Sequence, residues 1–193
     1  METTSSREIY ANPWMVLRED TFRRPDGGEG LYGVVDKPHY ALVIALEPAG
    51  SGPSPQDRMM LVEQFRYPLG LRRWEFPQGT APDRAEVPAH ELAARELREE
   101  TGLRAGTLTY LGLIDVAPGL SSQRGRAFLA TDLTAGEPAR EDTEADMRFA
   151  WVTRAEFERR ARDGEVTDAQ SLAAYALLLL RSSPPHGRGA WNP

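Results

Sequence analysis

Three glutamates near the middle of the chain, Glu96, Glu99 and Glu100, are the residues whose type and spacing best suit chemistry. On a helical wheel of about 100° per residue, Glu96 and Glu100 fall within the stripe formed by Leu92 and Leu97, and Glu99 lies at its edge. An apolar stripe of this kind is normally buried. Two carboxylates on it, one turn apart, therefore break the expected pattern of apolar and polar residues.

Such carboxylates carry a cost. Like charges at positions i and i+4 destabilise a helix by a few tenths of a kcal/mol, and partial burial raises the penalty to several kcal/mol per unpaired ion. A divalent cation bound by oxygen ligands offsets this cost, and magnesium typically uses one or two carboxylates, several waters and substrate phosphates. The alternative is a solvated face on an acidic helix, which is what charge runs usually are. The apolar neighbours favour the metal.

The helix that carries these glutamates is predicted over residues 88–101, because proline suits a first helical turn and Gly102 is a good stop signal. Apolar runs and turn residues predict seven strands, over residues 15–23, 31–35, 40–46, 59–67, 108–116, 126–133 and 148–152. Two further helices are predicted over residues 154–162 and 168–180. Residues 1–6 are interpreted as a loose terminus and residues 182–193 as a disordered tail. This order favours an α+β or layered α/β/α domain over a regular βαβ repeat.

The composition excludes several kinds of site and partner. The chain of 193 residues has no cysteine, which rules out disulfides, thiolate zinc sites and a cysteine nucleophile. Its three histidines are scattered, which argues against a histidine zinc site. A net charge of -6 without a basic cluster argues against a nucleic acid polymer. A small phosphorylated substrate still fits, because a bound cation neutralises it locally.

Location and other site types were judged from the same sequence. No apolar run approaches the ~18 residues that span a bilayer, and the first residues lack a basic segment followed by an apolar stretch. We therefore expect a cytoplasmic protein without a membrane partner. The chain contains no P-loop, no dinucleotide-binding Gly-x-Gly-x-x-Gly and no Gly-x-Ser-x-Gly, so a kinase or serine hydrolase is not supported.

A family resemblance rests on residues 95–103, which read Arg-Glu-Leu-Arg-Glu-Glu-Thr-Gly-Leu. This stretch is similar to the second half of the Nudix box, R-E-U-x-E-E-x-G-U with U apolar, and Gly79 resembles the opening glycine of the box. The first half departs from the pattern, because Gly79 lies two residues further from Arg95 than expected and Val87 stands where the box has a glutamate. Glu86 is one position away. We interpret this as a two-residue insertion within residues 80–87.

Other segments resemble the ADP-ribose pyrophosphatase and nucleoside diphosphate sugar hydrolase branch of the family. They are residues 12–14, 61–67, 74–79 and 128–133 and the acidic loop 141–146, and the resemblance covers most of residues 8–181. It implies a Nudix-type α/β/α sandwich with a mixed central sheet and an N-terminal antiparallel strand region. It also implies three parts: a strand region over 1–38 that can mediate a homodimer, a hydrolase domain over 39–181, and the tail from 182.

The resemblance implies magnesium-dependent hydrolysis of a pyrophosphate bond, with ADP-ribose giving AMP and ribose 5-phosphate, and manganese as a possible substitute for magnesium. GDP-mannose or a UDP-sugar is an equally open substrate within this branch. Glu96 and Glu100 would be the main metal ligands, Glu99 would share or bridge, and the backbone carbonyl of Gln78 would complete a site. Arg95 would orient Glu99, its i+4 neighbour, although a plain surface ion pair is the competing interpretation.

The general base would come from the late acidic loop, with Glu144 as first choice and Glu141 as second, against the alternative of a merely solvated loop. Arg66 would contact a phosphate, because a guanidinium matches phosphate oxygens in pairs. Glu75 and Gly79 would face the substrate.

Aromatic side chains offer candidates for holding a base. Trp14, Tyr32 and Trp74 could stack a purine, but aromatic residues more often belong to a core or an interface. Trp14 is also a candidate for the dimer interface that the resemblance implies.

Two other functions remain open at this stage. The segment from Trp74 to Gly79 is also similar to dinucleoside polyphosphate and RNA 5′-pyrophosphate hydrolases. A different class is a non-catalytic Nudix-fold nucleotide sensor. Such modules often lose box glutamates, and all three are present here.

Overall fold

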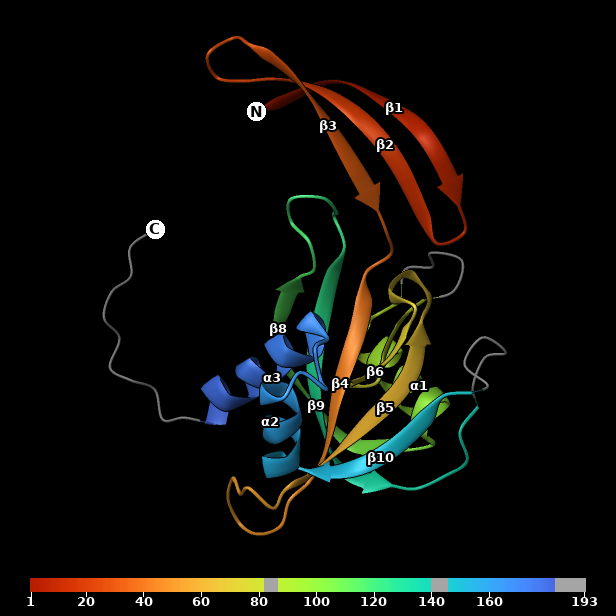
Figure 1. Cartoon of the computed structure of the whole chain (residues 1–193), viewed down its shortest axis with the longest axis vertical. Coiled ribbons are helices and arrows are strands. Elements are labelled where there is room, and N and C mark those ends of the chain that lie inside the picture. The colour runs from red at the N-terminus through yellow and green to blue at the C-terminus, as the bar shows by residue number, and fades with distance from the viewer. Residues whose placement is uncertain (82–86, 140–145, 183–193) are drawn as a thin grey trace, which may run out of the picture.

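The computed structural model describes residues 1–81, 87–139 and 146–182. Figure 1 shows a small sheet standing at one end of a larger layered domain. The small sheet is antiparallel, in the order β1 (Glu2–Asn12), β2 (Met15–Arg23) and β3 (Glu29–Asp36). Residues 1–6 are therefore not a loose terminus, because β1 pairs with β2 from Glu2 onward. The strand was missed because its side chains are almost all exposed, so it has no apolar alternation to detect.

The small sheet contacts the larger domain through the loop between β8 and β9. The N–H of Val35 donates to the carbonyl of Leu120 at 2.9 Å, and the hydroxyl of Ser121 donates to the carbonyl of Val35 at 2.7 Å. The hydroxyl of Tyr32 donates to the carbonyl of Gly119 at 2.8 Å. These bonds fix the end of β3, and so the entry into β4.

The larger sheet has seven strands in the order β10-β5-β4-β9-β8, with β6 beside β5 and β7 beside β4. The strands are β4 (Tyr40–Glu47), β5 (Arg58–Arg66), β6 (Leu71–Glu75), β7 (Gln78–Thr80), β8 (Arg104–Asp115), β9 (Arg124–Thr134) and β10 (Arg148–Thr153). The pair β4–β9 is parallel and the other pairs are antiparallel. The prediction of a mixed sheet is therefore confirmed.

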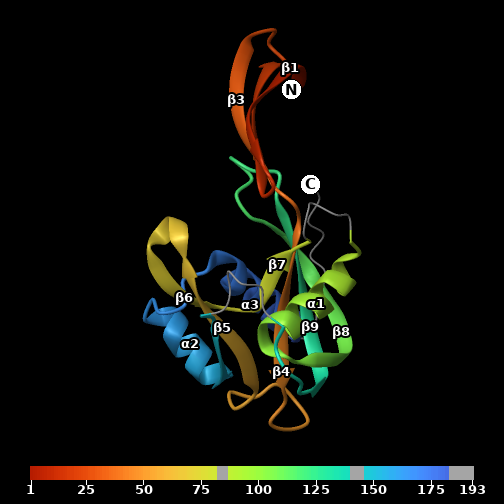
Figure 2. The same ribbon diagram turned by 90° about the vertical axis from the view of Figure 1, so that its right-hand side faces the viewer.

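Helices cover both faces of this sheet. Helix α1 (Ala89–Thr101) lies on one face, and α2 (Arg154–Arg162) and α3 (Ala169–Ser182) lie on the other, as Figure 2 shows around β4. Alternate residues of β4 feed the two cores: Leu42 and Ile44 pack on the side of α2 and α3, and Ala41 and Val43 pack on the side of α1. The predicted α/β/α sandwich of the α+β class is confirmed. No described helix is both long and apolar enough to cross a membrane.

The sheet opens between its two central strands. β4 and β5 pair only at Leu46↔Met59 and Glu47↔Arg58. Beyond these pairs the strands diverge, so that β6 takes the free edge of β5 and β7 takes the free edge of β4. These two strands were not predicted, because they are five and three residues long. A divergence of neighbouring strands is a common place for a ligand crevice.

The predicted helix ends agree with the structure to within two residues. Helix α1 follows Pro88 and stops at Gly102, whose φ is 77° and whose N–H donates to the carbonyl of Arg98 at 2.9 Å. A side chain at this position would also lie 2.2 Å from the carbonyl oxygen of Gly136, so only glycine fits. Helix α3 includes Ser182, which was assigned to the tail, and residues 183–193 lie outside the described residues.

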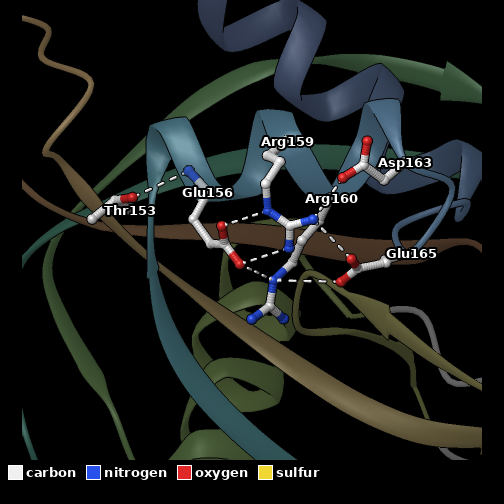
Figure 3. A network of polar contacts seen from close by, with 6 residues as sticks. All are labelled: Thr153, Glu156, Arg159, Arg160, Asp163 and Glu165. Atoms are coloured by element: carbon white, nitrogen blue, oxygen red, sulfur yellow. Dashed lines mark hydrogen bonds and ion pairs between the residues drawn. The ribbon is translucent and has the colours of Figure 1, made fainter.

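Helix α2 is held by an exposed cluster of charges. Its N-cap is Thr153, whose hydroxyl oxygen accepts the N–H of Glu156 at 3.1 Å. Figure 3 shows the cluster that follows, which we call the α2 network; its members are Glu156, Arg159, Arg160, Asp163 and Glu165. The network ties the last turn of α2 to the residues just after it.

Candidate active site

A pocket of about 700 Å³ lies where β4 and β5 separate. Its walls come from α1, from the β5–β6 hairpin, from β7 and from the start of α3. The lining residues used below are Gln64, Arg66, Arg73, Glu75, Gln78, Gly79, Arg95, Glu96, Glu99 and Asp168. Most of the residues singled out from the sequence are therefore brought together in one place.

The carboxylates of α1 meet the first residues of β7. Glu96 is 7% exposed, and a Cβ added at Gly79 would lie only 2.2 Å from its Oε2 atom. A side chain at position 79 would therefore displace this carboxylate from its place against the strand. Glu100 is fully buried and accepts the backbone N–H of Gln78 at 3.2 Å. The two glutamates on the apolar stripe are buried, as the helical wheel predicted.

Arg95 contacts the carboxylates of Glu96 and Glu99. Its Nε lies 3.7 Å from Oε2 of Glu99, and its Nη2 lies 3.5 Å from Oε1 of Glu96. The wheel position of Arg95 faces away from the apolar stripe, but the long side chain bends back to the pocket. The side chains of Arg95 and Glu99 are 27% and 25% exposed, so the pair is more enclosed than a typical surface ion pair.

The oxygen donors of the pocket suit a hard cation that is held by two protein carboxylates. Within the described ranges, no group of three or more Asp, Glu or His side chains is arranged to hold one metal ion. Magnesium needs only one or two protein carboxylates, since water and phosphate supply the rest. Glu96 and Glu99 line the pocket, whereas Glu100 does not. Two carboxylates beside the backbone of β7 therefore fit such an ion.

Glu75 and Arg66 form a buried pair on the β5–β6 wall. Glu75 is 1% exposed and accepts two bonds from Arg66, from Nη2 at 2.6 Å and from Nε at 3.2 Å. The amide of Gln64 donates to the same carboxylate at 2.5 Å. Burial raises the pKa of Glu75 to about 7, although Arg66 acts in the opposite direction. Both carboxylate oxygens of Glu75 thus accept hydrogen bonds from side chains of β5, and these bonds orient Arg66.

A second set of polar contacts, missed from the sequence, fastens β7 to α3. Oδ2 of Asp168 accepts the N–H of Ser171 at 2.8 Å, its hydroxyl at 2.7 Å and the side-chain amide of Gln78 at 3.1 Å. The hydroxyl oxygen of Ser171 in turn accepts the N–H of Phe76 at 2.9 Å. The only sequence signal was an Asp three residues before a Ser at a helix start, a common capping pattern. The turn that leads into β7 is therefore held by both α1 and α3.

The aromatic candidates separate clearly. Trp14 lines the pocket and is 71% exposed. The hydroxyl of Tyr32 donates a hydrogen bond to the carbonyl of Gly119. The ring of Trp74 packs against Arg160, whose guanidinium carbon lies 5.4 Å from the ring centroid. Of the three, Trp14 alone lines this pocket.

Three acidic residues named from the sequence cannot be placed. Glu141 and Glu144, the candidates for the general base, lie outside the described residues, and so does Glu86.

Two family models and several known proteins match this chain. The family model of the NUDIX domain matches residues 41–175, and that of the nucleoside diphosphate sugar hydrolase N-terminal domain matches residues 1–35. An ADP-ribose pyrophosphatase of Mycobacterium tuberculosis is 38% identical over 173 residues, which are 89% of this chain and 80% of the relative. An ADP-ribose pyrophosphatase of Bacillus subtilis is 28% identical over 183 residues, 94% of each chain.

A solved structure shares the fold. The crystal structure of an ADP compounds hydrolase superposes with a TM-score of 0.77 and covers 94% of this chain and 95% of its own. Its sequence identity is 18%, so the likeness speaks for the fold alone.

Proposed function

Because this chain belongs to the NUDIX family, we propose that it is a pyrophosphohydrolase of nucleoside diphosphate sugars, with ADP-ribose as substrate and AMP and ribose 5-phosphate as products. The observation that carries the proposal is the pocket itself. It sets two carboxylates of α1, Glu96 and Glu99, opposite the arginines of the β5–β6 wall. One side suits a cation and the other suits phosphate oxygens.

Magnesium is the proposed ion, with manganese as the alternative. Glu96 and Glu99, the two carboxylates of α1 that line the pocket, would hold it. Glu100, which accepts the N–H of Gln78, and the backbone carbonyl of Gln78 are the further candidate ligands. When bound, such an ion neutralises phosphate charge and stabilises the negative charge that develops as water attacks phosphorus. In this reaction the chain's own task is mainly positioning and electrostatic support.

Arg95, Arg66 and Gly79 have proposed parts in that positioning. Arg95 holds Glu99 and Glu96 in place through its two guanidinium contacts. Arg66, oriented by Glu75, presents its remaining N–H groups to a substrate phosphate. Gly79 keeps β7 close enough to Glu96 for both to face the same ligand.

Glu144 remains the first candidate for the general base and Glu141 the second. A positioned base usually contributes 10²–10⁴-fold to a rate. The turnover of Glu144→Gln at saturating magnesium should therefore fall by about a hundredfold or more, whereas a loss below about tenfold would remove Glu144 from this role. The same measurement on Glu141→Gln decides between the two.

A homodimer formed through the N-terminal strand region, residues 1–38, is part of the proposal, with residues 39–181 as the hydrolase domain. Large apolar side chains are exposed on the small sheet at Ile9, Tyr10 and Leu31, and at Trp14 in the turn between β1 and β2. Exposed apolar groups gathered in one region favour an interface. Light scattering should give the mass of two chains, and a monomer would overturn this part of the proposal.

The substrate is tested by a product assay. The chain is incubated with magnesium and ADP-ribose, GDP-mannose, a UDP-sugar, a diadenosine polyphosphate or 5′-triphosphorylated RNA, with Glu96→Gln as the blank. The proposal is supported if ADP-ribose gives AMP and ribose 5-phosphate and is turned over faster than the other compounds. ATP from the diadenosine compound, or turnover of the RNA, would favour the other hydrolase class, and no turnover at all would favour a nucleotide sensor.

A further inference from the structure

One arginine of the pocket has no role in the site described so far. Arg73 lies on β6, directly opposite Gln64 of β5 and two residues before Glu75. Residues two apart on a strand, and residues paired across strands, point to the same face of a sheet. Arg73 is therefore on the face that carries Arg66 and Glu75, and it lines the same pocket.

Arg73 differs from the other pocket arginines in its partners. Arg66 is compensated by Glu75, and Arg95 by Glu96 and Glu99. In the part of the chain that the structure describes, Arg73 forms no ion pair, and its one hydrogen bond runs from Nη1 to the carbonyl of Arg72 at 3.0 Å. Its Nε is buried without a hydrogen-bond partner. A buried donor left unpaired is costly, so the protein's own acceptors within the described ranges do not satisfy this guanidinium.

The two walls of the pocket also differ in charge. The β5–β6 wall carries two guanidinium groups and one carboxylate, Arg66, Arg73 and Glu75, which leaves an excess of positive charge. The α1 wall carries one guanidinium and two carboxylates, Arg95, Glu96 and Glu99, which leaves an excess of negative charge. The excess on the β5–β6 wall is contributed by Arg73, because Arg66 is already paired.

We propose that Arg73 binds a phosphate oxygen of the substrate. The inference rests on the proposed function, since it takes a phosphate-bearing ligand as the occupant. A guanidinium offers paired N–H donors that match phosphate oxygens, and it stays charged at every working pH. Two sources share this chemistry: the phosphate that leaves with the nucleotide and the phosphate that leaves with the sugar.

Calorimetric binding without turnover tests the inference. Inorganic pyrophosphate, AMP and ribose 5-phosphate are titrated, in buffer with magnesium, into the wild type, Arg73→Gln and Arg73→Lys. Arg104→Gln is the matched control, because Arg104 is an exposed arginine at the start of β8, outside the pocket lining. Circular dichroism checks that every variant is folded.

The Kd of pyrophosphate should rise by about tenfold or more in Arg73→Gln and stay unchanged in Arg104→Gln. Arg73→Lys should lie between, because lysine keeps the charge and loses the paired geometry. A matching loss for AMP assigns Arg73 to the nucleotide phosphate, and a matching loss for ribose 5-phosphate assigns it to the sugar phosphate. An unchanged pyrophosphate Kd in folded Arg73→Gln, or no measurable binding by the wild type, overturns the inference.

Steady-state kinetics on ADP-ribose separate this inference from the proposed function. If the wild type turns over ADP-ribose, Arg73→Gln should raise KM more than it lowers kcat, as expected for a binding residue. If the wild type is inactive on ADP-ribose but its pyrophosphate binding depends on Arg73, the proposed substrate is wrong and the phosphate contact stands. If the wild type turns over ADP-ribose normally and Arg73→Gln leaves both KM and the pyrophosphate Kd unchanged, the proposed function stands and the phosphate contact of Arg73 is wrong.

Discussion

Two clusters of arginine and carboxylate side chains in this molecule behave in opposite ways. In the α2 network, Arg159 contacts Glu156, Asp163 and Glu165, and all of these side chains are at least a third exposed (Figure 3). Hydrogen bonds from Arg159 and Arg160 lower the pKa of Glu156 to about 2. Each charged side chain of this network therefore contacts an opposite charge within the network.

In the pocket, the same residue types are more enclosed and are unevenly paired. Burial raises the pKa of Glu75 to about 7 even though Arg66 contacts it, and Arg73 has no carboxylate partner among the described residues. Perturbed ionisation in a cleft is a common mark of a functional site. The two regions therefore differ in burial and in the presence of a guanidinium that is unpaired among the described residues, more than in the number of ion pairs.

The sharpest way to break this comparison is to neutralise a carboxylate of the pocket. Glu96→Gln removes a proposed ligand charge, and several kcal/mol of transition-state stabilisation correspond to a loss of kcat of about a thousandfold. Glu91→Gln is the control, since Glu91 is exposed on the same helix. Turnover of ADP-ribose at saturating magnesium measures both. A loss of less than about tenfold in Glu96→Gln would contradict the proposed role of α1.

Gly79→Ala tests the pocket without changing any charge. The added methyl group would lie 2.2 Å from the Glu96 carboxylate, so that carboxylate must move. A displacement of about 1 Å in an active site can cost about a hundredfold in rate, and we expect a loss of that size with a higher magnesium requirement. Gly33→Ala is the control, because a Cβ there meets no atom within 4 Å. Equal activity of the two variants would show that Glu96 has room to adjust.

The part of the site that the sequence could predict is the part built by local periodicity. The burial of Glu96 and Glu100 follows from helical spacing alone, which needs no knowledge of the rest of the fold. Arg73 and Asp168 could not be predicted, because their positions depend on where β4 and β5 diverge and on how α3 meets β7. Such tertiary contacts leave no periodic signal.

Glu75 was only partly predictable from the sequence. The sequence indicated that it belongs to the site, and the structure places it in the pocket lining. The structure also shows that its oxygens are used by Arg66 and Gln64 of the neighbouring strand. A residue's membership of a site can thus be predicted from a motif, whereas the direction of its side chain follows from strand pairing.

Glu75→Gln should change how the stability of the protein depends on pH. The folded pKa of about 7 exceeds the ordinary value of 4.5, so the stability associated with the protonated form is complete below about pH 4.5 and is lost as pH rises through 7. A shift of this size corresponds to about 3 kcal/mol, and the glutamine variant does not titrate. Urea denaturation at about pH 5 and pH 8 should therefore show the wild type losing stability relative to Glu75→Gln. Parallel stabilities at the two pH values would contradict the raised pKa.

Glu156→Gln is the counterpart in the α2 network, and its effect should be the smallest. The folded pKa of Glu156 lies near 2, below the ordinary 4.5, so its contribution is present above pH 4.5 and is lost as pH falls toward 2. Because the network is exposed, the variant should lower Tm slightly at neutral pH and low salt, less so at high salt. Its kcat/KM for ADP-ribose should stay within about twofold of the wild type, since no member lines the pocket. A larger loss of activity would mean that the contact of Arg160 with Trp74 couples α2 to the β5–β6 wall.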